Sequence, residues 1–103
     1  MKGARRELLK RAIAKYGREN QIAKAMEEIG ELLTAVGRYE ARESLAREAL
    51  PDMLVYNIVD EIADARIMID QLAIIYGVEM RCEEREGHKL ARLEGRLAEG
   101  EGR

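Results

Sequence analysis

The hydrophobic positions along the 103-residue chain recur at intervals of three and four residues, and this spacing predicts helices. The first predicted helix covers residues 5–16 and ends at Gly17. A second helix begins near Asn20, the expected N-cap, and ends between Gly37 and Glu43. Its expected core-facing residues are Ile22, Met26, Ile29, Leu33 and Val36.

The second half of the chain predicts two further helices. Pro51 suits the first turn of a helix over residues 51–76, and Gly77 ends that helix. Residues 78–97 form the fourth predicted helix, which two internal glycines could kink. The chain contains no alternating Val-rich or Thr-rich run of the kind that predicts a strand.

The expected fold class is therefore all-α, a four-helix bundle in one domain over residues 1–98. Residues 99–103 contain only glycine and charged residues, and we expect them to be a disordered tail. The helix over residues 51–76 is apolar nearly all round, so it should be buried on most sides. Because one small bundle cannot cover so much apolar surface, we expect oligomerisation to complete it, as a homodimer or homotetramer.

Charge and cysteine content narrow the class of protein. The 18 basic and 20 acidic side chains give a net charge of -2, so no overall positive field attracts nucleic acid or an anionic membrane. The single cysteine, Cys82, cannot form an intramolecular disulfide, which favours a reducing compartment. Charged residues break every long apolar run, so we expect a soluble, cytoplasmic protein without a membrane span.

Carboxylates occur in pairs at helical spacing in the second and third predicted helices. A polar line runs through the apolar third helix, at Asn57, Glu61, Asp64 and Gln71. Burying carboxylates there is costly unless a cation or a donor satisfies them. Glu28 and Glu31 form a matching pair in the second helix, and antiparallel packing would bring both pairs around one space. An oxygen-only site of this kind favours Mg²⁺ or Mn²⁺.

These two pairs lie within EExxE, from Glu27 to Glu31, and ExxD, from Glu61 to Asp64. With these motifs the chain resembles the MazG-like all-α nucleoside triphosphate pyrophosphohydrolases over roughly residues 16–97. The separation of the motifs is slightly long for that family, with extra residues around 41–50. By this resemblance the Mg²⁺ ligands are Glu28, Glu31, Glu61 and Asp64, Glu27 is an outer acidic residue, and Asn57 contacts substrate.

The resemblance implies hydrolysis of a nucleoside triphosphate to a monophosphate and pyrophosphate. Because carboxylates alone repel a triphosphate, the metal is expected to be obligatory, with Glu27 or Glu31 as the base for the attacking water. The phosphates also need donors, for which we consider the basic residues near the motifs and on the fourth helix: Lys24, Lys89, Arg92 and Arg96. Each of these also fits a solvated helix face.

Three other classes of protein were weighed against this interpretation. A di-iron carboxylate bundle requires two ExxH motifs, and the only histidine, His88, is far from both acidic motifs. A nucleic-acid-binding regulator finds support in Arg5, Arg6 and Arg11, but the net acidity of the chain opposes it. A non-catalytic helical interaction bundle explains the amphipathic helices equally well and is the main alternative. It gives no reason for Glu61 and Asp64 in an apolar helix.

Overall fold

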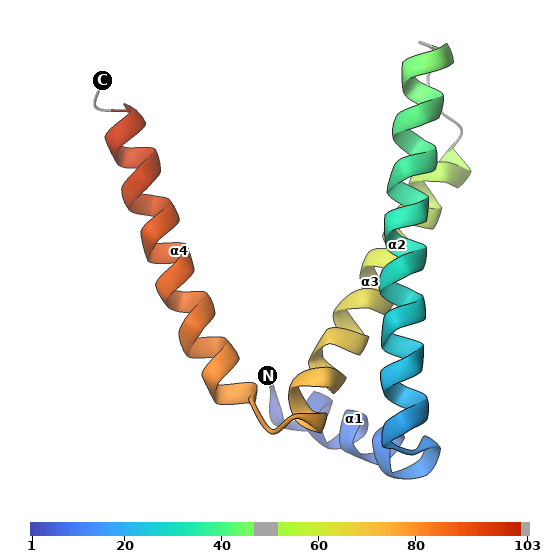
Figure 1. Cartoon of the computed structure of the whole chain (residues 1–103), viewed down its shortest axis with the longest axis vertical. Coiled ribbons are helices and arrows are strands. Elements are labelled where there is room, and N and C mark those ends of the chain that lie inside the picture. The colour runs from blue at the N-terminus through green and yellow to red at the C-terminus, as the bar shows by residue number, and fades with distance from the viewer. Residues whose placement is uncertain (47–51, 102–103) are drawn as a thin grey trace.

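The computed structural model describes residues 1–46 and 52–101, which form four α-helices and no strand (Figure 1). The helices are α1 (Gly3–Tyr16), α2 (Arg18–Ala46), α3 (Asp52–Ile75) and α4 (Glu79–Glu101). The prediction of an all-α protein with four helices is confirmed for these residues. None of the four described helices is long and apolar enough to cross a membrane.

The chain has the shape of a V (Figure 1). One arm is an antiparallel hairpin of α2 and α3, and α4 alone is the other arm. α1 crosses the base and contacts both helices of the hairpin. A single chain therefore does not close into the expected four-helix bundle, because α4 extends away from the other three helices.

Glycines define two of the helix boundaries. Gly17 has a φ of +92° between α1 and α2. Asn20 is not an N-cap, because α2 begins at Arg18 and the Asn20 amide donates a 2.8 Å hydrogen bond to the carbonyl of Tyr16. α2 also continues to Ala46, beyond its predicted end.

The end of α3 is a Schellman turn built on Gly77. The Gly77 amide donates to the carbonyl of Ile74, the Val78 amide donates to the carbonyl of Ala73, and Gly77 has a φ of +67°. α4 then runs without a break to Glu101, so residues 99–101 are helical rather than part of a tail. The predicted start at residue 51 and the tail residues 102–103 lie outside the described residues.

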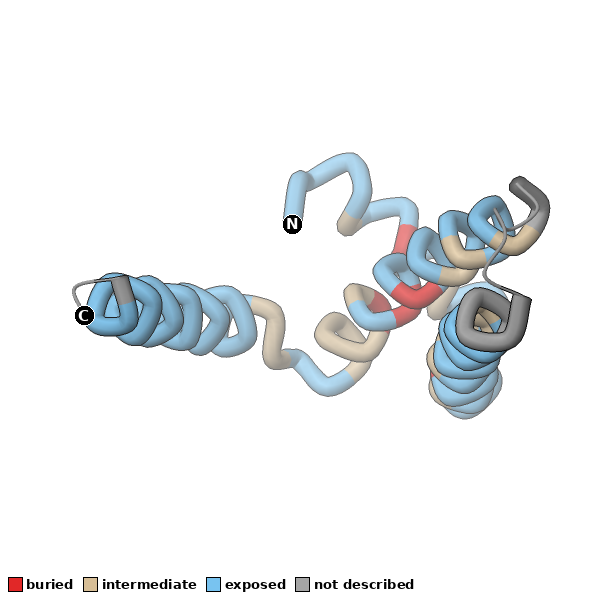
Figure 2. The backbone as a smooth tube through the Cα atoms, turned by 90° about the horizontal axis from the view of Figure 1, so that it is seen from above, coloured by how far each residue is buried: buried red, intermediate tan, exposed pale blue. Residues whose placement is uncertain are grey.

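The core of the described chain is small and lies where α1, α2 and α3 meet (Figure 2). Its buried apolar residues are Leu9, Ala25, Ala65 and Met68. Gln21 and Gln71 are also buried, and the Gln21 amide donates a 2.8 Å hydrogen bond to the Gln71 side-chain oxygen. Such mutual satisfaction is what allows two polar side chains to occupy a core.

The predicted core face of α2 is covered only in part, because Ile22 and Ile29 are half-buried whereas Val36 is exposed. Gln21, Ala25 and Glu28 follow the line of contact, whereas Met26 and Leu33 are 71% and 69% exposed. The buried Ala25 and Ala65 are small, which permits close approach of the two helices along this line.

The expectation that α3 is buried on most sides is also wrong for the single chain. About half of its large apolar side chains are exposed: Val55, Tyr56, Val59, Ile62, Ile67 and Ile69. The α2–α3 hairpin therefore combines one packed line with wide apolar surfaces that nothing in the described chain covers.

Candidate metal centre

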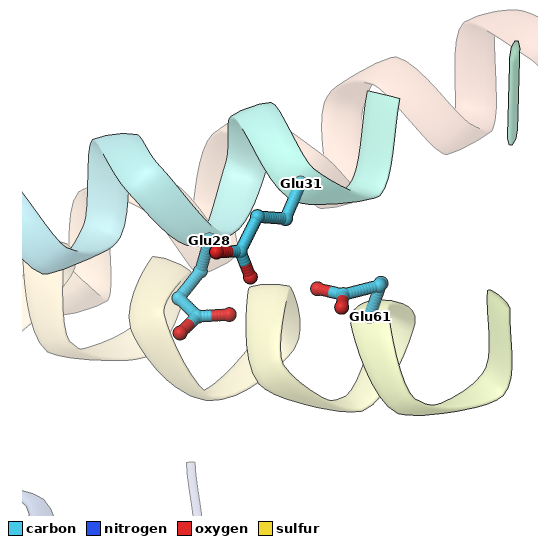
Figure 3. Close-up of side chains that lie close together, drawn as sticks. All are labelled: Glu28, Glu31 and Glu61. Atoms are coloured by element: carbon cyan, nitrogen blue, oxygen red, sulfur yellow. The ribbon is translucent and has the colours of Figure 1, made fainter. Parts of the chain in front are cut away.

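The hairpin brings three carboxylates together between its helices (Figure 3). Glu28 and Glu31 lie one turn apart on α2, and Glu61 faces them from α3. One oxygen from each residue lies within 4.8 Å of the other two. The structure thus confirms that helical spacing and antiparallel packing converge these three side chains on one space.

Two oxygens of this cluster are buried without a partner. Among the described residues, no donor forms a hydrogen bond with Oε2 of Glu28 or with Oε2 of Glu61. The Glu28 side chain is only 14% exposed, and its other oxygen, Oε1, lies 4.0 Å from the Lys24 ammonium. A buried carboxylate oxygen without a donor costs free energy, so the geometry favours a ligand that supplies positive charge.

The electrostatics of the site point in the same direction. Burial is the largest cause that raises the pKa of Glu28, followed by the negative charges of Glu31 and Asp64. Burial and the same two charges also raise the pKa of Glu61, with a further contribution from Asp60. Lys24 opposes the change at Glu28 only in part. The cluster therefore contains more negative charge than its surroundings neutralise.

The donor set fits a hard divalent cation. All three groups offer carboxylate oxygen, which is the preferred ligand of Mg²⁺, Mn²⁺ and Ca²⁺. The cluster includes no thiolate or imidazole, which are the usual ligands of zinc.

The other predicted site residues of the hairpin lie near the cluster but outside the group of three. Asp64 is exposed, although it is close enough to affect the pKa of Glu28 and Glu61. Asn57 lines an open hollow together with Glu31 and Glu61. Glu27 is exposed and lines a different hollow with Lys24. The structure thus places an open surface directly beside the carboxylates.

Arg38 is a neighbour of the site that the sequence interpretation missed. It lines the same hollow as Asn57 and Glu61, and it brings a positive charge to that surface. Its position seven residues after Glu31 puts both on one helical face, a signal that the sequence already contained.

The basic residues predicted on the last helix are not at this site in the single chain. Lys89, Arg92 and Arg96 are exposed on α4, which is the other arm of the V (Figure 1). Gly30, inside the EExxE motif, is not a point of close helix approach in the described chain, because a Cβ at Gly30 would meet nothing within 4 Å.

No protein family, curated protein or solved structure matches the chain in the comparisons made with it. Any chemistry must therefore be argued from the residues and their arrangement. A cluster of three converging carboxylates with two unpaired buried oxygens can bind a divalent cation, and the adjoining hollow offers Asn57 and Arg38 to a bound anion.

Proposed function

We propose that the protein is a metal-dependent nucleoside triphosphate pyrophosphohydrolase in which Glu28, Glu31 and Glu61 hold Mg²⁺ or Mn²⁺. One observation carries this proposal: three carboxylates from two helices converge, and two of their oxygens are buried without a partner. The EExxE and ExxD motifs around these residues support the choice of reaction, because they resemble those of the MazG-like enzymes.

Glu28, Glu31 and Glu61 would hold the divalent cation. The cation would offset the repulsion between these carboxylates and a triphosphate, and it would supply Lewis-acid activation of water for attack on phosphorus. The site residues have separate tasks. Arg38 and Lys24 flank the carboxylates with positive charge, Asn57 offers an amide to the substrate, and an oxygen of Glu31 or Glu27 accepts the proton of the attacking water.

The proposed reaction breaks one bond and forms one. Water oxygen bonds to the alpha phosphorus, the bond between that phosphorus and the alpha–beta bridging oxygen breaks, and pyrophosphate leaves with that bridging oxygen. The water proton passes to the carboxylate base and then to solvent. The products are a nucleoside monophosphate and intact pyrophosphate.

The direct test is hydrolysis in oxygen-18 water with added Mg²⁺, with a panel of canonical and modified triphosphates. Mass spectrometry and phosphorus NMR should show label in the monophosphate, and pyrophosphate as the first inorganic product. The Glu61→Gln variant is the matched control and should be inactive. Label in pyrophosphate, or early orthophosphate with a diphosphate, would contradict the proposed reaction.

A second candidate function is a non-catalytic interaction bundle. The observation that favours it is the amount of exposed apolar surface on α2, α3 and α4. The two functions separate in a thermal melt: only a metal enzyme gains stability from Mg²⁺ or Mn²⁺ through the three glutamates. Because Cys82 is exposed and unpaired, a reducing cytoplasm suits either function. We propose further that oligomerisation completes the bundle.

A further inference from the structure

Two lines of side chains, exposed at every member except the half-buried Glu79, run along different arms of the V. We call the first the α3 stripe, and its members are Val55, Val59, Ile62, Arg66 and Ile69. The second is the α4 line, and its members are Glu79, Glu83, Glu86, Leu90, Leu93 and Leu97. Within each line the residues are separated alternately by four and three positions, which places them on one helical face.

The three leucines of the α4 line have nothing to pack against within the described chain. Leu90, Leu93 and Leu97 are 58%, 49% and 57% exposed, and every residue of 80–100 is exposed (Figure 2). A helix of this length owes most of its stability in water to packing of an apolar face. Three leucines in line on a free-standing helix therefore indicate an interface.

The two lines match in antiparallel register. When Glu86 is set opposite Arg66, the same alternation places Leu90 opposite Ile62, Leu93 opposite Val59 and Leu97 opposite Val55. The one charged residue in the α3 stripe then meets a residue of opposite charge. Among the described residues, Arg66 and Glu86 have no ion-pair partner.

The base of the V holds α4 away from the α3 of its own chain. Arg6 on α1 binds Glu79 at 2.8 Å, and the Met1 amine binds Glu83 at 2.6 Å. Arg5 binds Asp70 of α3 at 2.9 Å. The first two members of the α4 line therefore contact the N-terminal segment, from Met1 to Arg6, and the leucines of the line lie farther along α4.

We infer that the occupant of the α3 stripe is the α4 helix of a second copy of this chain, and that the exchange is reciprocal. Two V-shaped chains related by a twofold axis can each place their α4 arm on the hairpin of the other. The α3 stripe and the α4 line of both copies are then covered, and the twofold symmetry closes the assembly at two chains. This dimer does not depend on the metal site.

The exchange leaves the carboxylate cluster accessible. Each member of the α3 stripe directly follows a residue on the side of α3 that faces α2: Leu54, Ile58, Glu61, Ala65 and Met68. Met26 and Leu33 likewise directly follow Ala25 and Leu32 on α2. Because the two helices are antiparallel, residues that directly follow a contact residue lie on the same face of the hairpin in both helices. The α3 stripe shares this face with Met26 and Leu33. Glu31 and Asp64 directly precede contact residues and therefore lie on the opposite face.

The test is disulfide cross-linking in a Cys82→Ser background under mild oxidation. A chain with both Val59→Cys and Leu93→Cys should give a covalent dimer on a non-reducing gel. Mixing the two single-cysteine variants should give a cross-linked heterodimer. The register control pairs Val59→Cys with Leu97→Cys, one turn away, and should cross-link at least several-fold less. A covalent monomer, which means closure onto the same chain, or no cross-link overturns the inference.

A second measurement keeps the inference testable without cysteine chemistry. Arg66→Glu and Glu86→Arg should each weaken the dimer in sedimentation, and the double variant should restore it. Leu93→Ala should shift the dissociation constant at least tenfold. Met80→Ala is the matched control, because Met80 is 82% exposed on α4 but lies off the line, and it should change nothing. A parent chain that stays monomeric at micromolar concentration overturns the inference, whatever its metal binding.

Discussion

Gln21 of α2 donates a 2.8 Å side-chain hydrogen bond to Gln71 of α3, and the two residues are the buried polar pair of the described chain. The Gln71 amide also lies 3.7 Å from the sulfur of Met68 in the core. This bond fixes how α2 and α3 are aligned at the base of the hairpin. The same alignment brings Glu28 and Glu31 of α2 close to Glu61 of α3 farther along the hairpin.

Gln71→Ala should therefore destabilise the fold by about 1–3 kcal/mol, because it leaves the Gln21 amide buried without an acceptor. Replacing both residues by Met should cost less than the single change, since no unpaired polar group remains. Urea unfolding measures both values. Asn20→Ala removes an exposed amide hydrogen bond and is the control, expected within about 0.5 kcal/mol of the parent. An equal loss in the control and in Gln71→Ala would contradict the role of the buried pair.

Glu61→Gln should abolish metal binding and turnover while the metal-free protein becomes more heat-stable. The gain arises because the substitution removes one of the mutually repelling charges beside Glu31 and Asp64. At a Mg²⁺ concentration roughly 100-fold above its dissociation constant, the parent should gain about 2.7 kcal/mol, and the variant none. Scanning calorimetry with and without Mg²⁺ measures this difference. Glu94→Gln, on α4, is the charge-matched control and should still respond to Mg²⁺.

The raised pKa of Glu28 and of Glu61 also fixes the sign of a pH dependence. A carboxyl group whose pKa is raised by folding stabilises the metal-free fold below the unfolded value, about 4.3 for Glu, and this contribution is lost as pH rises through the folded pKa. Between about pH 5 and about pH 7.5, the metal-free parent should lose more stability than Glu61→Gln does. Saturating Mg²⁺ should reduce this loss of stability in the parent, because the cation binds the ionised carboxylates. A steeper loss of stability with pH in Glu61→Gln than in the parent would contradict the raised pKa of Glu61.

The local features of the fold follow from the sequence. Periodicity and the two glycines with positive φ, Gly17 and Gly77, define the ends of α1 and α3. Glu28 and Glu31 were predictable as neighbours of Glu61 because each helix carries its acidic residues at helical spacing.

The face of α2 that packs on α3 was not predictable from periodicity. Two adjacent faces of α2 have the same helical period, and the one with larger side chains, Met26 and Leu33, is the exposed one. The position of α4 depends on ion pairs of Arg6 with Glu79 and of the Met1 amine with Glu83, which are far away in the chain. Such contacts leave no periodic signal in the sequence.

The last prediction concerns two glycines that respond to the same substitution in opposite directions. Gly77 has a φ of +67° in the turn between α3 and α4, where an L residue is strained, so Gly77→Ala should destabilise the fold by roughly 1 kcal/mol. Gly87 lies within α4, and a Cβ there would meet nothing within 4 Å. Gly87→Ala should therefore add about 0.5–1 kcal/mol of stability and increase the helical signal in circular dichroism.

Since neither Gly77 nor Gly87 is a member of the α4 line, both variants should retain the dimer and the response to Mg²⁺. Urea unfolding followed by circular dichroism compares the two. A gain of stability in Gly77→Ala would contradict the left-handed conformation of the turn at Gly77, and a loss in Gly87→Ala would contradict the open space around Gly87.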